Sequence, residues 1–162
     1  LDDLARGTGL RLRGESPTRG APPMTVRVTR SFDIDVPREE VWAFLSDPSK
    51  RAEAISVVDS YDRDGDETVW HVRLPIPLVR RTVAVRTRDV ERDPPRYVKF
   101  VGRSSAFSVT GEHEISERDG GSTITNSFVV DGTVPGVETF FKRSLDDELD
   151  RLEREIRDSA GE

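Results

Sequence analysis

Two polar residues fall where alternating apolar side chains predict the protein interior. His113 belongs to a predicted strand over about 107 to 118, and Asn126 belongs to the next strand, over about 122 to 131, so the two residues face each other across one hairpin. An imidazole with a pKa of about 6.5 can act as a general acid or base, and an amide can hold a carbonyl or hydroxyl of a ligand. His113 is therefore the best catalytic candidate. The alternative is a pair that only satisfies its own hydrogen bonds.

The other chemistry-bearing residues indicate no metal or cofactor site. His71 lies on the opposite alternation to Trp70 and is predicted to face solvent, so it should not share a metal with His113. The chain has no cysteine, which excludes disulfides and thiolate ligands. The segment 62–67 only partly matches a calcium loop, because His71 stands where a bidentate glutamate is needed. We expect a hairpin turn there.

Composition favours one acidic globular domain. The chain has 162 residues, 34% of them hydrophobic, and a net charge of -6, which argues against a nucleic-acid partner. It contains no apolar run long enough to span a membrane, and no secretory signal pattern is seen. A cytoplasmic protein, monomeric or weakly dimeric, is expected. Residues 1–23 are rich in glycine, proline and arginine and are predicted to be a disordered extension, with Met24 as the natural start and the domain over 24–162.

The predicted elements form a strand, two short helices, a meander and a long helix. The first strand runs from about 26 to 35, and Arg30 breaks its apolar face, which indicates an open edge or a paired inward charge. Pro37 is predicted as the first helical residue, and Asp47-Pro48 ends that helix before a second one over about 49 to 54. Six further strands are predicted over about 56–63, 66–74, 80–92, 96–103, 107–118 and 122–131.

A helix over about 135 to 159 has one apolar face, formed by Val137, Phe141, Leu145, Leu149, Leu152 and Ile156. That face needs a surface to cover, and the antiparallel strands before it supply one. A curved sheet wrapped on one helix can leave a cavity between them.

The element order, together with the segment 32–48 (FDIDVPREEVWAFLSDP), resembles the START-like (SRPBCC) superfamily. Within it the chain is most similar to the polyketide cyclase/dehydrase and lipid-transport group, which includes relatives of the G component of carbon monoxide dehydrogenase and coenzyme Q-binding START-like proteins. The resemblance implies an α+β helix-grip fold, with a curved seven-stranded antiparallel sheet around the C-terminal helix and a hydrophobic cavity. It does not name a reaction.

Alternation then assigns a set of inward residues as ligand contacts: Trp70, Val72, Leu74, Val85, Phe100, Phe107, Val109, His113, Asn126, Phe128, Phe141 and Leu145. The same residues would form an ordinary packed core if no space is left between them. Three alternatives are predicted for the apolar loop around Ile76, Pro77 and Leu78: a lid over the cavity mouth, a partner or membrane-surface contact, or a segment tucked onto the last helix.

Three functions follow from these patterns and from the resemblance. The first is binding of a hydrophobic small molecule, such as a lipid, quinone or polyketide-like compound, without a cofactor. The second is a cyclase or dehydratase in which His113 moves a proton. The third is an assembly factor for a metalloenzyme or membrane complex, as the similarity to the carbon monoxide dehydrogenase component implies.

Overall fold

A computed structural model describes residues 25–76 and 81–161, and in it seven strands form one antiparallel sheet in the order β1-β7-β6-β5-β4-β3-β2. The predicted extension over 1–23, Met24, and Pro77 and Leu78 of the predicted lid lie outside the described residues. The elements are β1 (Thr25–Ile34), α1 (Arg38–Leu45), α2 (Pro48–Glu53), β2 (Val58–Asp64), β3 (Glu67–Val72), β4 (Val83–Asp93), β5 (Tyr97–Arg103), β6 (Phe107–Arg118), β7 (Gly121–Gly132) and α3 (Val137–Ser159).

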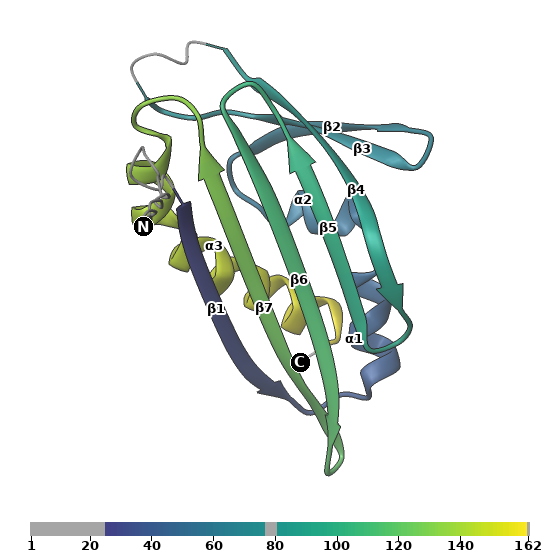
Figure 1. Ribbon diagram of the computed structural model, residues 1–162. Helices are drawn as coiled ribbons and strands as arrows, with labels where there is room; N and C mark the ends of the chain where they lie inside the picture. The colour runs from purple at the N-terminus through teal and green to yellow at the C-terminus, as the bar shows by residue number, and fades with distance from the viewer. Residues whose placement is uncertain (1–24, 77–80, 162) are drawn as a thin grey trace, which may run out of the picture.

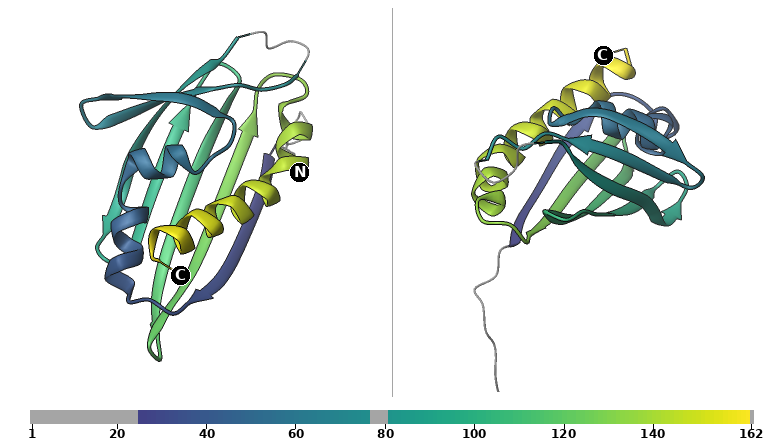
Figure 2. Two further views of the ribbon diagram at one scale, coloured as in Figure 1. Left: turned by 180° about the vertical axis from the view of Figure 1, so that it is seen from behind. Right: turned by 90° about the horizontal axis from the view of Figure 1, so that it is seen from above.

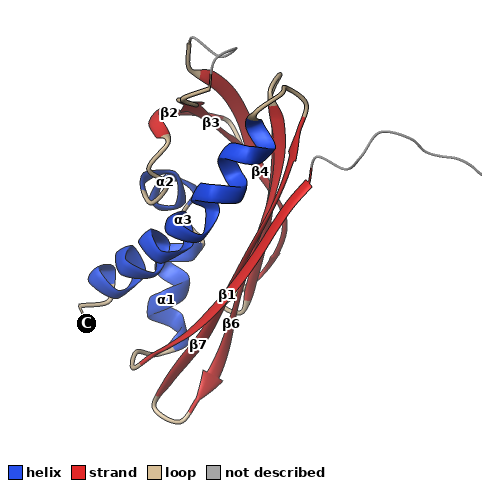
Figure 3. Ribbon diagram, turned by 90° about the vertical axis from the view of Figure 1, so that its left-hand side faces the viewer, coloured by secondary structure: helices blue, strands red, loops and turns tan. Residues whose placement is uncertain are grey.

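All three helices lie on one side of the sheet (Figure 3). The axes of the antiparallel strands β5, β6 and β7 are closely aligned, whereas the β2–β3 hairpin lies across them (Figure 1). Seen from above, the sheet curves around α3 (Figure 2). The architecture is the helix-grip fold, and its concave side is the place where a site can form.

Tight turns fix the strand pairing. Gly65 between β2 and β3 and Gly120 between β6 and β7 have φ of 66° and 73°, a left-handed conformation that glycine adopts without steric cost. The resulting register pairs His113 with Asn126 and Ile115 with Ile124. Each such pair shares one face of the sheet, so the predicted inward residues of β6 and β7 meet in the same layer.

The helix starts differ slightly from the predictions. Pro37 is the residue that precedes α1, with extended backbone angles (φ -61°, ψ 150°), so the helix begins at Arg38 and the predicted first-turn position of Pro37 is wrong. Asp47 caps α2 by accepting a hydrogen bond from the Ser49 amide at 2.9 Å. The helix α3 buries the whole predicted apolar stripe. None of the described helices is long and apolar enough to cross a membrane.

Both explanations offered for Arg30 hold. Its strand, β1, is an edge of the sheet, and its guanidinium reaches α3, where it pairs with Asp150 and lies 3.4 Å from Asp146. An ion pair that is partly exposed to water contributes little to stability. Its effect is to tie the edge strand to the middle of α3.

Candidate functional site

An apolar cavity lies between the sheet and α3. Its lining is Ile55, Val57, Val58, Trp70, Val72, Phe107, Val109, Phe128, Val130, Phe141, Leu145 and Glu148, and the surface it exposes is apolar. Its volume is about 30 Å³, which is room for roughly two water molecules. A larger guest therefore requires the walls to move apart.

The strands β2, β3, β6 and β7 build this cavity together with α3 and the segment after α2. Alternation on β3 places Trp70 and Val72 on the concave face, and the same rule applies on β6 and β7. From α3, Phe141 and Leu145 are one helical turn apart and face the sheet. The Phe107 and Phe141 rings have their centroids 5.1 Å apart, which joins β6 to the helix above it.

Among the described residues that line the cavity, Glu148 alone is ionisable. It is 6% exposed, and its carboxylate accepts hydrogen bonds from the Ser56 amide at 2.9 Å and from the Ser56 hydroxyl. A buried carboxylate needs such donors. Glu148 thus fastens α3 to the segment after α2. The sequence did not indicate this role, because a charged residue is not expected on the apolar face of a helix.

The structure brings seven of the predicted ligand contacts to the cavity wall: Trp70, Val72, Phe107, Val109, Phe128, Phe141 and Leu145. Leu74, Val85 and Phe100 are buried in the core but do not line it. Ile76 is half-buried and packs against the core, and with Gly136 at the start of α3 it lines a surface hollow.

His113 lies deeper than the cavity and is 1% exposed. Its Nδ1 is 2.8 Å from the Asn126 Oδ1, and because that oxygen accepts, Nδ1 carries the proton and Nε2 keeps a lone pair. Burial, and then the charge of Arg51, lower the pKa of His113 to about 3, against the weaker opposing effect of Asn126. The imidazole is therefore neutral at physiological pH.

Among the described residues, the gap beside this imidazole is too small to hold a water molecule. It is enclosed by Arg51, Ile55, Phe100, His113, Phe128 and Leu152. Ile55 and Phe128 border both this gap and the cavity, whereas His113 lines only the gap. His113 and Asn126 are thus a packed pair in this structure, and their contact with a ligand stays a prediction.

His71 is far less enclosed. Its side chain is 32% exposed, and its Nε2 lies 2.9 Å from Asp62 on the neighbouring strand. In the part of the chain that the structure describes, no group of three or more histidine, aspartate or glutamate side chains could hold a metal ion.

Comparison with known proteins adds a family and a fold. The sequence model described as polyketide cyclase / dehydrase and lipid transport matches residues 25–157. A conserved protein from Geobacillus kaustophilus is similar in structure, with a TM-score of 0.64 at 18% identity, covering 83% of this chain and 97% of that one. A START superfamily protein from Mycobacterium smegmatis has a TM-score of 0.64 at 10% sequence identity, and the match covers 83% of this chain and 97% of that one. The Zhui aromatase/cyclase from Streptomyces sp. R1128 has a TM-score of 0.59 at 14% sequence identity, and the match covers 82% of this chain and 94% of that one. A search of curated proteins by sequence found no match.

Proposed function

This chain belongs to the polyketide cyclase / dehydrase and lipid transport family, and from that membership we propose that it binds an apolar small molecule between its sheet and α3. One observation carries the proposal: the hollow under α3 exposes only apolar surface. Such a surface favours a guest that leaves water without losing hydrogen bonds. The ligand class is therefore hydrocarbon-rich, such as a lipid, quinone or polyketide-like compound.

The position of His113 favours binding over the enzymatic alternative. A general base must come within hydrogen-bond reach of the proton that it removes, and His113 does not line the cavity. A pKa of about 3 also makes His113 a weak base at neutral pH. The assembly-factor alternative depends on the loop around Ile76 and stays a prediction, because Pro77 and Leu78 lie outside the described residues.

A cavity-filling substitution tests the proposal. Titration with the neutral fluorophore N-phenyl-1-naphthylamine should give saturable binding to the wild type. Val109→Phe adds a ring to the cavity wall and should weaken that binding by about tenfold or more. Val90→Phe adds the same ring at a position that is 42% exposed, and it should bind like the wild type. No binding by the wild type, or equal binding by both variants, would overturn the proposal.

A further inference from the structure

A second hollow lies between α2 and the strands β2, β3 and β4, and its volume is about 290 Å³. Its lining is Pro48, Arg51, Arg63, Asp66, Thr68, Thr87, Arg88, Asp89 and Arg92, and we name it the arginine pocket. Among its lining side chains, Arg51, Arg63 and Arg92 outnumber Asp66 and Asp89 by one charge. Arg88 is not counted, because it pairs opposite Glu67 on the other face of the sheet. The whole chain, in contrast, carries -6. Positive charge is thus concentrated here on an otherwise acidic protein.

The inner wall of the arginine pocket is a buried guanidinium. Arg51, which is 4% exposed, donates to the Leu45 carbonyl at 2.7 Å and pairs with Asp89. Its Cζ also lies 5.1 Å from the centre of the Phe100 ring. The Arg51 Nε is buried and has no hydrogen-bond partner in the described part of the chain. This donor is closed off from the hollow, so Arg51 offers a ligand its charge and not a free Nε–H.

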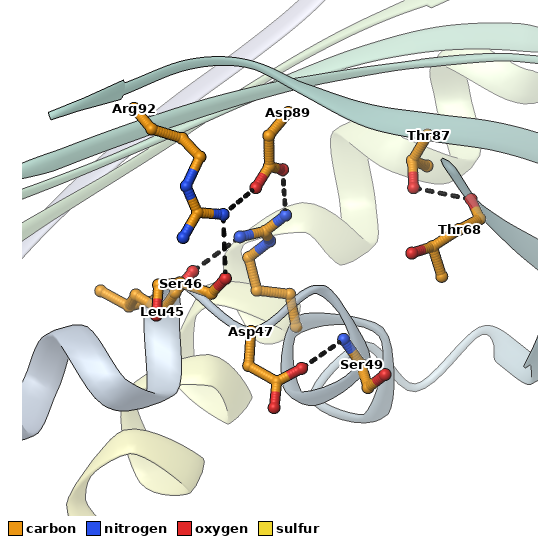
Figure 4. A network of polar contacts seen from close by, with 9 residues as sticks. Leu45, Ser46, Asp47, Ser49, Thr68, Thr87, Asp89 and Arg92 are labelled. Carbon is orange, nitrogen blue, oxygen red and sulfur yellow. Dashed lines mark hydrogen bonds and ion pairs between the residues drawn. The ribbon is translucent and has the colours of Figure 1, made fainter. Parts of the chain in front are cut away.

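The carboxylate of Asp89 is fully occupied by two arginines. One oxygen pairs with Arg51, and the other lies 2.6 Å from the Arg92 Nη1, which also donates to the Ser46 carbonyl at 3.2 Å (Figure 4). Asp89 is well shielded from water, with its side chain 11% exposed. One carboxylate shared by two guanidinium groups leaves this trio of side chains with one positive charge in excess.

The outer wall adds a free cation and a hydroxyl. Arg63 pairs opposite Thr68 in the β2–β3 register, so both side chains share the concave face. No hydrogen bond or ion pair holds the Arg63 side chain among residues 25–76 and 81–161. Thr87 donates to the Thr68 carbonyl at 2.7 Å, while the Thr68 hydroxyl points toward the Arg92–Asp89 side of the pocket (Figure 4).

We propose that the arginine pocket binds a multiply charged oxyanion, the phosphate group. Guanidinium groups bind phosphate through paired N–H donors, which makes arginine the preferred side chain for this recognition. The hollow is larger than a phosphate ion, so the phosphate of an organic ester also fits. This site is separate from the apolar cavity, and its ligand is charged whereas the ligand of the cavity is apolar.

Calorimetric titration with inorganic phosphate and with phenyl phosphate tests the proposal, in buffers matched to the same chloride concentration. Wild-type protein should bind phosphate with a stoichiometry of one. Arg63→Gln removes the free cation and should weaken binding by about tenfold. Arg27→Gln, which removes the same charge from an exposed position on β1, at the opposite edge of the sheet, should leave it unchanged.

The two ligands separate the sources of the phosphate group. Tighter binding of phenyl phosphate supports an organic ester, and equal binding supports free phosphate. Absence of binding by both ligands at millimolar concentration would overturn the proposal. Equal affinities for Arg63→Gln and Arg27→Gln would overturn it as well. Naphthylamine binding reports separately on the apolar cavity, so either proposal can fail alone.

Discussion

At the scale of single residues, His113 is held uncharged by the core, and this makes stability depend on pH. Its pKa is about 3 in the folded state and about 6.5 in the unfolded chain. Between these pH values the unfolded state binds a proton that the folded state does not bind. The contribution of His113 to the free energy of unfolding is therefore fully present above pH 6.5 and is lost as the pH falls toward 3. Between pH 7 and pH 5 the loss is about 2 kcal/mol by this linkage.

Urea unfolding at pH 7 and pH 5 measures this effect. His113→Gln removes the titrating group and should lose less unfolding free energy between the two pH values than the wild type does. His71→Gln replaces the partly exposed histidine by the same side chain and is the matched control. A pH dependence in His113→Gln as steep as that of the wild type would contradict the assignment.

At the scale of elements, α3 is fastened to the rest of the domain by Glu148. Glu148→Ala leaves the Ser56 amide and hydroxyl without their acceptor and opens space next to the cavity. The free energy of unfolding should fall by about 2 kcal/mol or more, since each lost charge-assisted bond leaves a donor unsatisfied. Asp147→Ala, at the neighbouring exposed position, is the matched control and should change stability by about 0.5 kcal/mol or less. Equal unfolding midpoints for the two variants would argue against the fastening role.

Most elements could be predicted because their signals are local. Apolar alternation bounded by glycine turns placed β6 and β7 to within one residue of their observed ends. The predicted strand over 66–74 is too long, because β3 ends at Val72. The Ile76 amide donates to the Leu74 carbonyl at 2.9 Å, so the chain turns there although Leu74 stays buried.

The sites were harder to predict because they depend on contacts between distant segments. Alternation found five of the cavity residues on strands, but the predicted set lacked Val58 and Val130. Ile55 and Val57 come from the segment between α2 and β2, where the apolar residues follow no regular spacing. The register of β4 shifts between Asp89 and Glu91. Arg92 beyond this shift contacts Ser46 and Trp42, which belong to the concave side of the sheet. A bulge of this kind has no clear sequence pattern, so the arginine pocket could not be predicted.

At the scale of the whole molecule, the concave face is divided by chemistry. Along β3, Thr68 lines the arginine pocket, whereas Trp70 and Val72 line the apolar cavity. Arg51 and Phe100 stand between the two, with the guanidinium over the ring. The sheet therefore offers a charged site and an apolar site on one surface, separated by a buried cation–π contact.

The size of the apolar cavity makes a kinetic prediction. Because about 30 Å³ cannot hold a naphthylamine, α3 and the sheet must separate before the probe enters, and opening should limit uptake. In stopped-flow mixing the observed rate should therefore reach a plateau as the probe concentration rises. Arg30→Gln removes the contact between β1 and Asp146 and Asp150 of α3, which favours opening.

The plateau rate of Arg30→Gln should increase by roughly two- to fivefold, because an exposed ion pair contributes up to about 1 kcal/mol. Arg27→Gln changes the outward face of the same strand and should leave the plateau where it is in the wild type. A rate that stays proportional to probe concentration would show that the cavity is already open to the ligand. In that case Arg30 would hold the edge strand without controlling entry.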